Sequence, residues 1–151
     1  MITARNISDF FLAKAIETES FISNLKLQKL VYYAQAWHLG IKEKEIFEDD
    51  FQAWVHGPVL PSLYHDYKHF RWTPIILDQK PEITIPGELN NFLEDICTEY
   101  FACEAYDLER MTHAERPWQQ ARQGLKPDEP SSNIIEKGWM KEFYGSRAQE
   151  A

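Results

Sequence analysis

Residues 24 to 40 read Asn-Leu-Lys-Leu-Gln-Lys-Leu-Val-Tyr-Tyr-Ala-Gln-Ala-Trp-His-Leu-Gly. Apolar side chains recur there at spacings of three and four residues, which places them on one side of an α-helix. Ser23 or Asn24 can cap the first turn, and Gly40 can adopt the left-handed conformation that ends a helix. The stretch therefore predicts a buried central helix. Its apolar stripe comprises Leu27, Leu30, Val31, Ala34 and Trp37, with Ile41 continuing it.

Five side chains of this helix fall outside the apolar stripe. They can cover neighbouring helices, or they can line a groove that receives a helix from a partner protein. Periodicity does not separate these two interpretations, but the exposure of the side chains does. The five are Gln28, Lys29, Tyr32, Tyr33 and Gln35.

The segments on either side predict further helices. We expect one over residues 4 to 17 capped by Thr3 or Ser8, one from Pro61 to Tyr67, and an amphipathic one over residues 89 to 101. Shorter helices are expected around residues 108 to 111 and from residue 117 to 124. A last helix is expected to be capped by Asn133 and to stop at Gly145, with residues 145 to 151 frayed.

Alternating side chains over residues 51 to 55 predict a short β-strand, which His56-Gly57-Pro58 ends. The β-rich fragments at residues 75 to 77 and 83 to 85 are candidates to pair with it. The expected fold is therefore α+β and mainly α. It is one compact domain over residues 1 to 151, with about six helices around the central helix and a two- or three-stranded antiparallel sheet.

Composition restricts the classes of function. The chain has 16 Lys and Arg against 24 Asp and Glu, giving a formal net charge of −8. No run of basic residues supplies the face that phosphate contacts require, so nucleic acid is an unfavoured partner. The N-terminus lacks the apolar stretch of a signal peptide, and no run of about 18 apolar residues occurs. We expect a cytoplasmic protein without a membrane partner.

No pattern of catalytic residues is present. The sequence has no G-x-S-x-G elbow and no Gly-rich phosphate loop, so we expect no enzyme activity and no cofactor. Cys97 and Cys103 are six residues apart in a predicted helix, which disfavours a disulfide or a zinc knuckle. His65 and His69 share a helical face, but no third ligand stands at a recognisable spacing. A small metal-dependent enzyme is therefore a minor alternative.

Three blocks of sequence resemble a known family. The first is Leu-Gln-Lys-Leu-Val-Tyr-Tyr-Ala-Gln-Ala-Trp at residues 27 to 37, and the second is Ala-Trp-Val-His-Gly-Pro-Val at residues 53 to 59 with the Leu63-Tyr64 and Tyr67-Lys68 pairs. The third is Thr-His-Ala-Glu-Arg-Pro-Trp at residues 112 to 118, followed by Ala121-Arg122. Together and in this order, they resemble the Panacea domain of the SocA-like, phage-associated antitoxin family.

The resemblance implies an antitoxin of a toxin–antitoxin system that neutralises a cognate protein toxin by direct binding. Toxins associated with the family include alarmone-synthetase-like enzymes. SocA-like members can also act as proteolytic adaptors that pass a toxin to a cellular protease, so the resemblance leaves occlusion and delivery as alternatives. A phage-associated regulatory interaction is a further alternative.

Candidate partner-binding residues lie in and beside two turns of the sequence, at His56-Gly57-Pro58 and at residues 112 to 116. Aromatic and Arg side chains are favoured as interface anchors. The alternative interpretation is that the histidines stabilise the turns and the aromatics belong to the core, which is the favoured one for Tyr64 and Trp118. The candidates are Trp54, His56, Tyr64, Lys68, His113, Trp118 and Arg122. With Arg122 or His113 at an interface, substitution by Ala would weaken binding and leave the melting temperature nearly unchanged.

Overall fold

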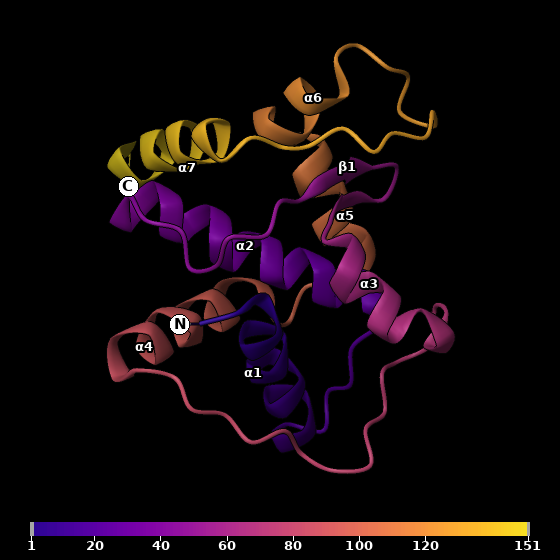
Figure 1. Ribbon diagram of the computed structural model, residues 1–151, viewed down its shortest axis with the longest axis vertical. Coiled ribbons are helices and arrows are strands. Elements are labelled where there is room, and N and C mark those ends of the chain that lie inside the picture. Colours follow the sequence, from indigo (N-terminus) through magenta and orange to yellow (C-terminus); the bar gives the residue numbers. More distant parts are fainter. Residues whose placement is uncertain (1, 151) are drawn as a thin grey trace.

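The computed structural model describes residues 2 to 150 and has the expected α+β, mainly α, architecture. Figure 1 shows α2 running through the middle of the molecule, with α7 along one side of it and α4 along the other. The elements are α1 (Ala4–Glu17), α2 (Asn24–Lys42), β1 (Gln52–Trp54), β2 (Gly57–Val59), α3 (Pro61–Tyr67), a 3-10 turn (Lys68–Phe70), α4 (Gly87–Tyr100), α5 (Ala105–His113), α6 (Arg116–Arg122) and α7 (Lys137–Glu150). No helix in residues 2 to 150 has the length and apolar character needed to cross a membrane.

The predicted buried central helix is confirmed. Ser23 caps it by accepting a hydrogen bond from the Lys26 amide, and the apolar stripe from Leu27 to Ala34 is buried. Ile41 is 50% exposed, so the expectation that it continues the stripe is wrong. The side chains outside the stripe are buried as well, and they therefore cover neighbouring elements instead of lining a groove. They are Gln28, Lys29, Tyr32, Tyr33 and Gln35.

Gly40 does not end α2. The helix continues to Lys42 and ends where Glu43 adopts a left-handed conformation. Gly40 lies where α2 crosses α7, and a Cβ atom built on it would stand 2.6 Å from the backbone nitrogen of Gly145. Both glycines are therefore explained by the close approach of two helices, and not by helix termination.

The last helix also differs from its expected bounds. It begins at Lys137, not at Asn133, and it passes through Gly145 to Glu150. The Asn133 side chain donates a hydrogen bond to the Ala121 carbonyl, so it stabilises the preceding loop and does not cap α7. Residues 145 to 150 are helical, and residue 151 lies outside the described part of the chain.

The strand at residues 51 to 55 pairs with a different partner from the one expected. β1 forms an antiparallel hairpin with β2, in which Trp54 opposes Gly57 and Gln52 opposes Val59. Residues 75 to 77 and 83 to 85 form no strand in the described chain. Gly57 has a φ of 107°, a conformation that favours glycine, and it allows the chain to reverse directly after β1.

Candidate partner-binding site

The corner of the β-hairpin presents His56 to solvent above α5. The His56 Nδ1 atom lies 2.8 Å from Glu109 Oε1, which joins the hairpin to that helix. Next to it, Gly57 packs so tightly that an added Cβ would stand 2.5 Å from the Lys29 Cε and 2.9 Å from the Thr112 Oγ1. The corner is thereby held on α2 and α5 at once.

A buried lysine lies beneath this corner. Lys29 is 1% exposed, and its Nζ contacts the backbone carbonyls of Leu25 and Pro58 at 3.5 and 3.4 Å. Burial lowers the pKa of Lys29 to about 7, and the Glu109 carboxylate opposes that shift. Sequence reasoning missed the role of Lys29 and of Glu109, because no local signal marks a helical lysine as buried beneath a distant turn.

The second predicted turn packs against the hairpin through aromatic rings. The His113 and Trp118 rings stack with centroids 4.0 Å apart, and the Trp118 Nε1 donates a hydrogen bond to the Trp54 carbonyl at 2.8 Å. Burial lowers the pKa of His113, with Glu109 opposing the shift. The two predicted turns are therefore brought together, as the sequence suggested, but Trp118 is buried at their junction.

Arg122 is a structural residue, and its expected place on an exposed surface is wrong. The side chain is 2% exposed and its guanidinium lies over the Trp118 ring, 4.7 Å from the ring centroid. It donates hydrogen bonds to the backbone carbonyls of Ala53, Lys126 and Glu129. The Arg122 guanidinium thus holds α6, β1 and the loop after α6 together. Arg122→Ala should therefore lower the melting temperature, contrary to the expectation for an interface residue.

The four remaining candidates are exposed or half-buried. His56 and Lys68 are exposed, while Trp54 and Tyr64 are half-buried with ring centroids 5.0 Å apart. We name these four residues the corner face. An open hollow lined by Trp54, His56 and residues 130 to 132 adjoins it. Whether these residues bind a partner stays a prediction.

The half-buried Glu115 carboxylate makes hydrogen bonds to two tyrosines of the core. Glu115 Oε1 accepts hydrogen bonds from the hydroxyls of Tyr33 and Tyr144, both at 2.8 Å. Burial raises the pKa of Glu115, and the two tyrosine hydrogen bonds oppose that shift. This glutamate therefore links α2 to α7 through the turn before α6.

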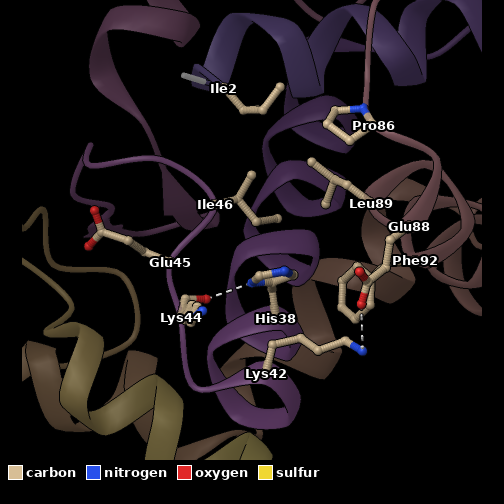
Figure 2. Close-up of a pocket in the computed structure, with 10 residues that line it drawn as sticks. All are labelled: Ile2, His38, Lys42, Lys44, Glu45, Ile46, Pro86, Glu88, Leu89 and Phe92. Carbon is tan, nitrogen blue, oxygen red and sulfur yellow. Dashed lines mark hydrogen bonds and ion pairs between the residues drawn. The ribbon is translucent and has the colours of Figure 1, made fainter.

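Another hollow, of about 420 Å³, lies at the C-terminal end of α2. Figure 2 shows the side chains that line it. Its apolar lining comes from the start of the chain, the loop before β1 and α4, and Lys42 on its rim pairs with Glu88 at 3.6 Å. The His38 ring packs on Phe92, and its Nδ1 lies 2.6 Å from the Lys44 carbonyl. None of the predicted site residues lines this hollow.

His65 on α3 and His69 in the 3-10 turn that follows are both exposed. Within residues 2 to 150, no three His, Cys, Asp or Glu side chains gather into a group able to hold a metal ion. Cys97 and Cys103 are free thiols, and burial raises the pKa of Cys97 to about 12, which disfavours a reactive thiolate.

Comparison with known proteins gives the family. The family described as "Antitoxin SocA-like, Panacea domain" matches residues 27 to 119. The chain belongs to this family. The Panacea match includes the hairpin corner, Lys29 and the His113–Trp118 stack, whereas α1 and α7 lie outside it.

A curated Panacea relative is Antitoxin SocA of Caulobacter vibrioides. The chain is 40% identical to it over 63 residues, which are 42% of this chain and 34% of that protein. The chain therefore spans about a third of the length of the curated relative that it matches. No solved structure matches the chain.

Proposed function

We propose that this protein is the antitoxin of a toxin–antitoxin system, and that it neutralises a cognate protein toxin by direct, stoichiometric binding in the cytoplasm without catalysing a reaction. Membership of the Antitoxin SocA-like family is the observation that carries the proposal. An alarmone-synthetase-like enzyme is the first class of toxin to test.

We place toxin binding at the corner face, because its side chains are accessible while the backbone beneath them is fixed. Lys29, Glu109 and Thr112 hold the hairpin corner from below, and the Trp118 indole holds β1. A surface fixed in this way loses little conformational entropy on binding. Trp54 and Tyr64 supply aromatic contact area, and Lys68 supplies a positive charge for an acidic group of the toxin.

Growth of cells that express the small open reading frame beside this gene tests the proposal. We expect toxicity when that reading frame is expressed alone and rescue when this protein is co-expressed. A double variant, His56→Ala with Lys68→Glu, should lose the rescue. Lys141→Ala is the matched control, because Lys141 lies on α7 in an exposed pair with Glu43. Absence of toxicity from either neighbouring gene would contradict the proposal.

The amount of toxin in the rescued cells separates the two modes of neutralisation. If the toxin persists at its original level, neutralisation is by occlusion, as proposed. If the toxin disappears only when a cellular protease is present, this protein delivers it for degradation. Equal rescue by wild type and the double variant would keep the antitoxin role and remove the corner face as its binding site.

A further inference from the structure

A tight turn directly after the 3-10 turn carries an arginine and a tryptophan in solvent. The Thr73 amide donates a hydrogen bond to the Phe70 carbonyl at 3.1 Å, which closes a four-residue turn with Arg71 and Trp72 at its tip. Arg71 is exposed, and Trp72 is 77% exposed. Figure 1 shows this part of the chain at the outer edge of the molecule, beyond the end of α3. We name Arg71 and Trp72 the tip pair.

The backbone of Arg71 has a conformation that suits glycine. Its φ is 56° and its ψ is −125°, a region that is strained for a residue with a side chain. Among residues 2 to 150, the Arg71 side chain makes neither an ion pair nor a cation–π contact that would offset this strain. Strained residues of this kind gather at functional sites. The Arg71 side chain is therefore a candidate for a role in binding.

The tip pair lies in a locally basic stretch of a chain whose formal net charge is −8. Lys68 is exposed, and its carbonyl accepts a hydrogen bond from the Arg71 amide at 2.9 Å. Asp66, the one acidic residue from position 65 to position 72, pairs with Arg5 at 2.6 Å. Within the described residues 2 to 150, neither Lys68 nor Arg71 has a carboxylate partner. Two unpaired positive charges therefore accompany an exposed indole.

The turn is anchored on both sides. Tyr67 before it and Ile75 after it are buried, and Phe70 packs against the core. The Ile75 amide donates a hydrogen bond to the Ile22 carbonyl at 2.8 Å. A surface on an anchored backbone loses little conformational entropy when a partner binds. The turn thus presents the tip pair in a fixed position.

We propose that the tip pair and Lys68 receive an acidic segment of the toxin, with the Arg71 guanidinium on one of its carboxylates and the Trp72 indole in an apolar hollow beside it. The proposal rests on the proposed function, because Lys68 belongs to the corner face and the tip pair extends that face. Arginine pairs with a carboxylate through two parallel hydrogen bonds, and Arg and Trp side chains are enriched among the residues that dominate binding energy. A nucleic acid is a poorer occupant, because phosphate binding requires more cations than this surface offers.

The test measures binding of the full-length protein to the purified toxin, encoded by the small open reading frame beside this gene, by surface plasmon resonance. Arg71→Gly should weaken binding about tenfold or more without lowering the melting temperature, because glycine suits the backbone of the turn. Trp72→Ser should weaken binding to a similar extent. Lys80→Ala is the matched control, because Lys80 lies on the same loop in an exposed pair with Glu17. It should change the affinity by less than about twofold.

Salt separates the contribution of charge from that of shape. Association of the wild type with the toxin should slow as the salt concentration rises, since salt screens the attraction between opposite charges. The association rate of Arg71→Gly should depend less on salt, whereas that of Trp72→Ser should depend on salt as the wild type does. Far-UV circular dichroism checks that the variants fold, and Trp72→Ser decides the outcome if Arg71→Gly does not.

Four results would overturn the proposal. Wild-type affinity of both tip variants would remove the tip pair from the interface and leave the antitoxin proposal unchanged. A lower melting temperature of Arg71→Gly, with unchanged affinity, would show that the arginine supports the fold. Binding of a short DNA duplex by the wild type and not by Arg71→Gly would assign the tip pair to nucleic acid. Failure of the wild type to bind the toxin would contradict the antitoxin proposal, and this one with it.

Discussion

Replacing Lys29 by Met should stabilise the protein and remove a specific part of its pH dependence. The Lys29 side chain is fully buried, and its Nζ has only two long contacts to carbonyl groups among residues 2 to 150, so the ammonium group is poorly compensated for the loss of water. Methionine has a similar length and no charge. We expect the variant to be about 1 to 4 kcal/mol more stable at pH 7.

The magnitude follows from the pKa in the two states. The pKa of Lys29 is about 7 in the folded protein, against about 10.4 for a lysine in an unfolded chain. Between these values the unfolded state binds more protons, so the stability of the wild type rises with pH. The full penalty, on the order of 5 kcal/mol, is present below pH 7 and declines toward pH 10.4. From pH 6 to pH 9 the wild type should therefore gain about 2 to 3 kcal/mol relative to Lys29→Met.

Urea unfolding at several pH values from 6 to 9 measures this difference. Comparing the two proteins at each pH cancels the contributions of other groups, including the Cys97 thiol, whose pKa burial raises. Lys42→Met is the control, because Lys42 is exposed and its pair with Glu88 is a surface contact. Parallel stability curves for wild type and Lys29→Met, or a variant less stable than the wild type at pH 6, would refute the reasoning.

Three other substitutions test the packing. Arg122→Ala should lower the free energy of unfolding by about 3 kcal/mol, because it leaves three backbone carbonyls without their donor, and a melting temperature within 2 °C (roughly 0.5 kcal/mol) of wild type would contradict that role. Gly40→Ala should cost roughly 1 to 3 kcal/mol in urea unfolding by pushing α7 from α2, and an unchanged midpoint would show that the helices can separate freely. Leu30→Ala should cost about 2 to 5 kcal/mol as a truncation in the buried core, and a loss below about 1 kcal/mol would mean that the site collapses around the smaller side chain.

Local patterns were sufficient for most of the helices. Thr3 caps α1 through a reciprocal pair of hydrogen bonds with Asn6, and the spacing of apolar residues in α2 and α4 matches their buried sides. These features depend on residues within a few positions of one another, which a sequence displays directly.

Gly40 and Gly145 were misinterpreted because glycine is favoured both at helix ends and where two helices approach closely. Gly40 and Gly145 have the sequence context of helix ends, yet each removes a side chain from the crossing of two distant helices. A local pattern cannot reveal that crossing, since the two glycines are far apart in the chain. The pairing of β1 with β2 was missed for a similar reason. It depends on the positive φ of Gly57, which the sequence does not display.

The candidate site was predicted in part. The sequence correctly suggested that the His56 turn and the His113 turn lie together, and the Trp118 hydrogen bond to the Trp54 carbonyl shows the contact. It did not reveal that Arg122 is enclosed by three carbonyl groups from β1 and from the loop after α6, or that Lys29 lies under the corner. Burial of a charged side chain depends on distant partners, and the residue type alone predicts exposure.

Titration of the purified toxin with this protein, followed by the toxin's own activity, tests the central claim most directly. Direct neutralisation predicts that activity falls in proportion to the added protein and is abolished near one equivalent, without any protease, and that the corner-face double variant requires a large excess. Full toxin activity in the presence of an excess of wild-type protein would contradict neutralisation by direct binding.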